Sequence, residues 1–171
     1  MLHVDDLHLA FQHSRAILPD SADSAALYMF WDTPDVWTRQ VEEVRDGLIA
    51  VGHAMTPALE VVIANHIDQD DMGPLVIEGD QILPSLFARD VVRCRATTDR
   101  VRGVFLVEPD EGALLASIEA RGRVVAGQSA AGRKNEARAK WATGGGWPRK
   151  RVVRACRSSK RAPRTRSTNA C

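Results

Sequence analysis

Apolar positions along the chain recur in two rhythms, which predict helices alternating with short strands. Between residues 33 and 52 they recur every three or four positions, as on one buried helix face. This helix is expected to begin at Thr33-Pro34-Asp35, where a capping threonine precedes a proline and an acid. Thr56-Pro57 repeats that start, so a second helix is expected from there to the turn at residues 70–74.

Short apolar runs predict the strands. The clearest one, residues 75–77, stops on Glu78, Gly79 and Asp80, and a second run covers residues 102–108. A strand-like piece, residues 2–4, ends at Asp5 and Asp6. Further helices are expected at residues 21–31 and 82–89, after a cap at Asp110, and at residues 137–141. This alternation favours an α/β fold, with a parallel sheet covered on both faces.

Composition and charge divide the chain in two. With 171 residues and 44% hydrophobic content, it is long enough for one well-buried core. Residues 1–136 hold 12 Lys/Arg and 22 Asp/Glu, whereas residues 137–171 hold 11 basic residues and no acid. We therefore expect one domain over residues 1–141 and a disordered basic tail over residues 142–171, where too few apolar side chains exist to offset chain ordering.

Localisation signals favour the cytoplasm. The three cysteines are widely spaced and show no metal-binding pattern, so free thiols are expected. The N-terminus lacks a basic and then apolar signal pattern, and no apolar run approaches the roughly 18 residues of a membrane span. We expect a soluble cytoplasmic protein with no membrane partner.

The acids that follow two predicted strands are the strongest candidates for chemistry. Phosphoryl transfer requires a cradle of backbone amides, a magnesium ion and an acid that orients the acceptor. Glu78 and Asp80 could hold the magnesium ion, and Asp5 and Asp6 could orient a hydroxyl. The alternative for each pair is a helix cap or a solvated loop acid.

Arginines would neutralise the charge on the transferred group, because a guanidinium binds phosphate oxygens in bidentate fashion. Arg121 and Arg123 follow the helix capped by Asp110, and Arg133 lies further along the same region. A surface-charge role is the alternative for each. The amide cradle has no good candidate: residues 127–134 have its glycine spacing but carry arginine and lysine where lysine and Ser/Thr belong.

On these residues the chain resembles the P-loop small-molecule kinases, and more narrowly the 2-phosphoglycerate kinase-like or AAA-type ATPase-like proteins. The resemblance spans about residues 3–141. Its matching blocks are residues 4–7, 33–37, 48–52, 75–84 and 104–111.

The resemblance implies an incomplete three-layer αβα parallel sheet and, in the intact family, ATP-dependent phosphotransfer to a small-molecule hydroxyl with ATP and Mg²⁺ as cofactors. Arg121, Arg123 and Arg133 would then contact ATP. In such kinases a first strand and a phosphate loop precede the strand at Val4, so we expect a late start site or a truncated gene, and a frameshift to explain the acid-free tail. The chain as given is expected not to turn over ATP.

Two other functions are open. The basic tail could bind nucleic acid weakly and without sequence preference, by displacing counterions from phosphates. Alternatively, the chain is a nonfunctional truncated product. The identity of the phosphate acceptor does not follow from these residues, because acceptor pockets vary within one fold.

Overall fold

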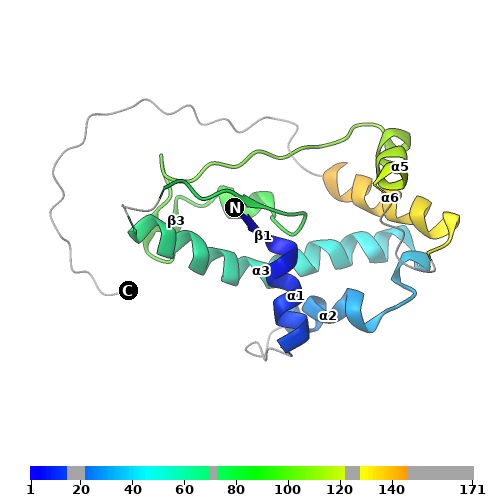
Figure 1. The fold of residues 1–171 in the computed structure, drawn as a ribbon, viewed down its shortest axis with the longest axis horizontal. Helices are drawn as coiled ribbons and strands as arrows, with labels where there is room; N and C mark the ends of the chain where they lie inside the picture. The colour runs from blue at the N-terminus through cyan, green and yellow to red at the C-terminus, as the bar shows by residue number, and fades with distance from the viewer. Residues whose placement is uncertain (15–21, 70–72, 122–127, 146–171) are drawn as a thin grey trace, which may run out of the picture.

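One long helix organises the molecule. The computed structural model describes residues 1–14, 22–69, 73–121 and 128–145, shown in colour in Figure 1. Helix α3 (Val41–Asp68) runs through its middle and contacts both α2 (Ala22–Asp32) and α6 (Ala130–Gly145). Its apolar residues face a core that includes Val51, Met55 and Leu59, each exposed by 2% or less. The expected periodicity is therefore correct, although its boundaries are not.

Helix α3 replaces the two helices that the sequence predicted. Thr33-Pro34 does not begin it, since only a short 3-10 turn, η1 (Val36–Thr38), forms there. Pro57 does not end it and lies inside the helix. Pro57 has no N–H to donate to the carbonyl of His53, a defect that ordinarily costs about 3 kcal/mol in a helix interior. Burial of Met55 and Leu59 on either side offsets that cost, because both side chains are almost fully removed from water.

The N-terminal region is helical where a strand end was expected. Strand β1 (Leu2–His3) passes directly into α1 (Val4–Ser14), which packs against α2. His8 Nε2 and Gln12 Nε2 both approach the carbonyl oxygen of Leu27, at 2.7 and 3.0 Å. These contacts link α1 to α2 through buried polar groups, so the two helices cover one side of α3 together (Figure 1).

The expected three-layer αβα parallel sheet is wrong. Of the described residues, 63% are helical and 6% lie in strands, and these strands form only two pairs. Strand β1 pairs in parallel with β2 (Ile77–Glu78), and β3 (Val91–Val92) pairs in antiparallel fashion with β4 (Arg95–Ala96). The run at residues 102–108 joins no strand, although its side chains alternate between half-buried and exposed. Two-residue ladders cannot form a layer, so helix packing around α3 makes the core.

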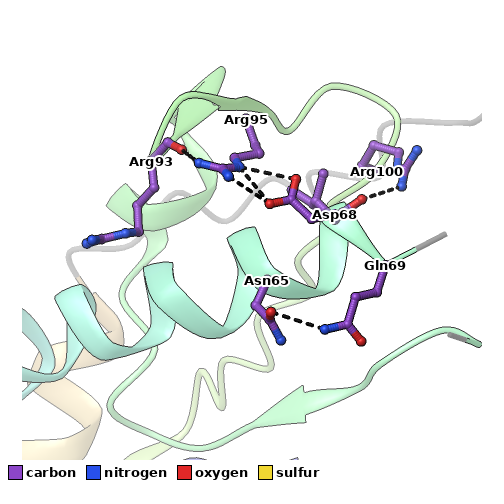
Figure 2. A network of polar contacts seen from close by, with 7 residues as sticks. Asn65, Asp68, Gln69, Arg93, Arg95 and Arg100 are labelled. Carbon is purple, nitrogen blue, oxygen red and sulfur yellow. Dashed lines mark hydrogen bonds and ion pairs between the residues drawn. The ribbon is translucent and has the colours of Figure 1, made fainter. Parts of the chain in front are cut away.

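The β3–β4 hairpin is fastened to the C-terminal end of α3 (Figure 2). Its turn residues Arg93 and Cys94 both have positive φ, 43° and 65°, as a type I′ turn requires. Asp68 of α3 accepts hydrogen bonds from Arg95 Nε and Nη2, at 3.0 and 2.7 Å, and this pairing raises the pKa of the Arg95 guanidinium. Cys94 is disulfide-bonded, whereas free thiols were expected.

The remaining helices agree better with the sequence. Helix α4 (Pro84–Phe87) lies inside the expected helix at residues 82–89. Helix α5 (Glu111–Ala120) begins at the expected cap, where Asp110 Oδ1 accepts a hydrogen bond from the Ala113 amide at 2.7 Å. Helix α6 contains the expected residues 137–141 but is longer at both ends. The tail from residue 146 onward lies outside the described residues.

Helix α3 also has the length and composition of a membrane-crossing helix. Its most apolar 18-residue window has a mean hydropathy of 1.6, and half of that window is buried inside the fold. It is the one helix within residues 1–14, 22–69, 73–121 and 128–145 that meets both criteria. The core helix of a soluble protein can meet them too, so this finding leaves localisation as a prediction.

Candidate functional site

The candidate acids lie in or just after two paired strands, β1 and β2. The two strands are parallel, with Leu2 opposite Ile77 and His3 opposite Glu78. Their carboxyl ends therefore point the same way, and we call the four acids at or just beyond these ends the acid edge: Asp5, Asp6, Glu78 and Asp80. The sequence predicted that both pairs follow strands. It did not predict that these strands are direct neighbours.

Asp5 and Asp6 occupy a different local structure from the one expected. They do not end a strand but stand in the first turn of α1, where the partial positive charge of a helix N-terminus favours carboxylates. Helix α1 begins here because Val4, Leu7, His8 and Phe11 recur at helical spacing, a signal that was readable in the sequence. The local geometry thus agrees with the alternative in which Asp5 and Asp6 are acids at a helix start. The two residues also lie just after strand β1, as expected.

Glu78 is paired with His3 on the neighbouring strand. His3 Nδ1 contacts Glu78 Oε1, and both side chains are largely exposed. His3 could not be singled out from the sequence, because a lone histidine 75 positions from its partner has no recognisable spacing. The pair stabilises the two-residue ladder from its exposed face.

Asp80 and α6 are joined by Lys140. Lys140 Nζ lies 3.4 Å from Asp80 Oδ2 and 3.1 Å from Glu136 Oε1. Burial lowers the pKa of the Lys140 ammonium, but the charges of Asp80 and Glu136 and hydrogen bonds to both outweigh burial, so its pKa lies above the ordinary value. Lys140 is therefore a fixed positive charge beside Asp80, and no pattern in the sequence predicts this role.

Backbone packing holds β2 close to α1. Gly79 has a φ of +153°, which favours glycine, and a Cβ placed on it would lie 2.8 Å from Cβ of Val4. Next to it, Gln81 Oε1 is buried without a hydrogen-bond partner among the described residues. A buried orphan acceptor costs roughly 1–3 kcal/mol. A hydroxyl donor or a water molecule beside Gln81 would remove that cost.

The predicted arginines are not gathered at the acid edge. Arg121 is the exposed C-cap residue of α5, and Arg123 lies outside the described residues. Arg133 Nη1 donates to the carbonyl oxygen of Gln128 at 2.9 Å, within its own helix start. It precedes Lys140 by seven positions, which is roughly 10 Å along a helix. Arg133 therefore serves local structure here, and Lys140 is the cation that reaches Asp80.

The acid edge suits a weakly held Mg²⁺ better than a tightly caged metal. Within the described residues, no three His, Cys, Asp or Glu side chains gather closely enough to enclose a metal ion. Magnesium, however, usually takes one or two carboxylates and completes its shell with water and substrate phosphates. Glu78 and Asp80 supply such oxygens; Glu78 contacts the His3 ring and Asp80 pairs with the Lys140 ammonium.

Comparisons of this chain with protein-family models, curated proteins and solved structures found no match.

Proposed function

We propose that this chain is a kinase-like domain whose acid edge is the magnesium and acceptor side of a site for ATP-dependent phosphotransfer to a small-molecule hydroxyl. The observation that carries the proposal is the parallel pairing of β1 with β2. That pairing puts the carboxyl ends of the two strands side by side, which supports a site built from the acids at those ends. Only two strands pair there, so the proposal concerns the edge and not a complete sheet.

Each charged group at the edge has a role in this proposal. Glu78 and Asp80 would hold Mg²⁺, which neutralises charge on the transferred group when bound. Asp5 and Asp6 orient the acceptor hydroxyl from the first turn of α1. Lys140, once released from Asp80, faces the phosphate oxygens as a point charge. The orphan acceptor Gln81 Oε1 offers a further hydrogen bond to a hydroxylated ligand.

Turnover of ATP by this 171-residue chain is expected to be absent. The sequence has no glycine-rich loop that ends in Lys-Ser or Lys-Thr, and such a loop supplies the backbone amides that grip the phosphates. We therefore expect weak metal–nucleotide binding without consumption of ATP.

The test is Mn²⁺ binding by the protein in the presence of ATP, measured as the loss of the free Mn²⁺ electron paramagnetic resonance signal beyond the loss that the same ATP concentration causes without protein. The double variant Glu78→Gln/Asp80→Asn should weaken binding at least fivefold, because it removes both candidate ligands. Asp46→Asn is the matched control, since Asp46 is exposed on α3 and pairs with Arg45. Equal binding by the double variant and the wild type would overturn the proposal. Magnesium-dependent consumption of ATP by the chain would contradict the separate expectation that it does not turn over ATP.

A further inference from the structure

A second site lies on the other side of β2, against the C-terminal half of α3. It is a cavity of about 130 Å³ bounded by α3, β2, α4 and the segment that follows β4. Most of its walls are apolar side chains, including Ile63, Ile67, Leu75, Ile77, Leu86 and Phe87. None of the acids of the acid edge lines it, so it is a separate site.

The size of the cavity limits what it can hold. A cavity of roughly 150 Å³ lined by leucine, isoleucine and phenylalanine is large enough for benzene and stays dry when empty. This cavity is slightly smaller, and its wall combines apolar side chains with Arg100, Arg102 and His66. One aromatic ring or a short branched chain therefore matches it, whereas a nucleotide does not.

The polar residues of the cavity wall are all basic or neutral. Among the residues that line it, Arg100, Arg102 and His66 carry the ionisable groups, and no Asp or Glu is present. Arg100 Nη2 donates to the carbonyl oxygen of Ile67 at 2.9 Å, which holds that side chain against the last turn of α3 (Figure 2). His66 Nε2 lies 2.8 Å from the carbonyl oxygen of Gly73 and is the donor there. Both groups are thus positioned by the backbone.

Arg102 is the group left for a ligand. It is exposed at the wall of the cavity, and no hydrogen bond or ion pair joins it to another residue in the described part of the chain. A guanidinium binds a carboxylate through two parallel hydrogen bonds, and the nearby positive charge of Arg100 adds to the preference for an anion. Apolar walls with an arginine at the edge suit a molecule that is apolar at one end and anionic at the other.

We propose that this cavity binds a small apolar carboxylate, with its ring or branched chain against Ile63, Ile77 and Leu86 and its carboxylate on Arg102. This site does not depend on the proposed phosphotransfer function, because it shares no charged residue with the acid edge. The bound molecule would fill the gap between α3 and β2.

The experiment compares 4-fluorobenzoate with fluorobenzene, its uncharged relative, by ¹⁹F nuclear magnetic resonance titration of the full chain. The wild type should bind 4-fluorobenzoate saturably and at least fivefold more tightly than fluorobenzene. Arg102→Gln should abolish that preference but keep fluorobenzene binding, because the apolar walls are unchanged. Arg45→Gln is the control, since Arg45 is a cation near the other end of α3 that pairs with Asp46.

A filling variant locates the site. Leu75→Phe adds a ring at the cavity wall and should weaken binding of both compounds, with the fold checked by circular dichroism. If Leu75→Phe does not fold, Arg102→Gln still decides the test, because it changes an exposed side chain and should leave the fold intact. The proposal is overturned if the wild type binds neither compound, if Arg102→Gln keeps the wild-type preference, or if a folded Leu75→Phe variant binds like the wild type.

Discussion

Lys140 shows how much of this molecule depends on single charges that join distant segments. It links α6 to Asp80, 60 positions earlier, and also pairs with Glu136 on its own helix. Both acids raise its pKa against the opposing effect of burial. The ammonium is therefore charged throughout the physiological pH range, and its contribution to stability has a defined pH dependence.

Replacement of Lys140 by methionine should lower the free energy of unfolding by about 1 kcal/mol at pH 7. Because the folded pKa lies above the unfolded value of about 10.4, this contribution is complete below that pH and is lost as the pH rises through the folded pKa. Urea unfolding of the wild type and Lys140→Met between pH 7 and 11 measures it. The difference should be constant to about pH 10 and then shrink.

The control for this experiment is Arg138→Met. Arg138 is on the same helix and makes one exposed ion pair, with Glu111. Arg138→Met should lower the free energy of unfolding by less than Lys140→Met does. Its effect on the free energy of unfolding should not shrink near pH 10.5. A Lys140→Met difference that grows with pH would contradict the assigned direction of the pKa shift.

At the scale of elements, the helical character of α3 was predicted correctly from the sequence, but its first and last residues were not. The helical spacing of its apolar residues is visible in the sequence. The two Thr-Pro pairs are local signals for a helix start, and burial of the residues on both sides of Pro57 favours one continuous helix over a new start there. Thr56 Oγ1 donates to the carbonyl oxygen of Gly52 at 2.8 Å, so the threonine that looked like a cap bonds back into the helix instead.

Replacement of Pro57 by alanine should raise the free energy of unfolding by roughly 1–3 kcal/mol, because it restores the hydrogen bond to the carbonyl of His53 and removes the ring clash. Pro57 is exposed, so the change leaves the core intact. Chemical denaturation followed by circular dichroism measures the effect. His53→Ala, an exposed change on the same helix, is the control and should change stability by less than about 1 kcal/mol.

Other elements show what local patterns can and cannot predict. Asp110 caps α5 as expected, because a cap depends on residues within one turn. The strand at residues 102–108 was expected from its apolar run, but no neighbouring strand pairs with it, and pairing depends on distant segments. For the same reason the acids of the candidate site could be selected from the sequence, whereas their partners His3 and Lys140 could not.

At the scale of the whole molecule, exposed apolar side chains on extended segments affect behaviour in solution. Val76, Val104 and Leu106 are exposed by 58%, 69% and 93%. Val104 and Leu106 lie in extended backbone that joins no described ladder, whereas the carbonyl oxygen of Val76 accepts the Leu2 amide. Unpaired extended backbone with apolar side chains is prone to association with other chains.

Leu106→Lys should therefore reduce self-association without a loss of stability, because the leucine side chain is almost entirely exposed in the monomer. Sedimentation velocity over a range of concentrations should show the wild type associating at concentrations where the variant is monomeric. Leu9→Lys, a change at an exposed leucine on α1, is the control and should behave like the wild type. Unchanged association of Leu106→Lys would show that this surface is not involved.

The parallel β1–β2 ladder has a consequence for how the molecule assembles. The His3–Glu78 pair joins residues 75 positions apart, and the ladder beside it has only two residues per strand. Closing so long a loop is entropically costly, and a ladder this short contributes too little stabilisation to offset that cost until α1 and α3 have formed. The amide of Leu2, which donates to the carbonyl oxygen of Val76, thus reports a late event in folding and should exchange with deuterium sooner than amides in the middle of α3.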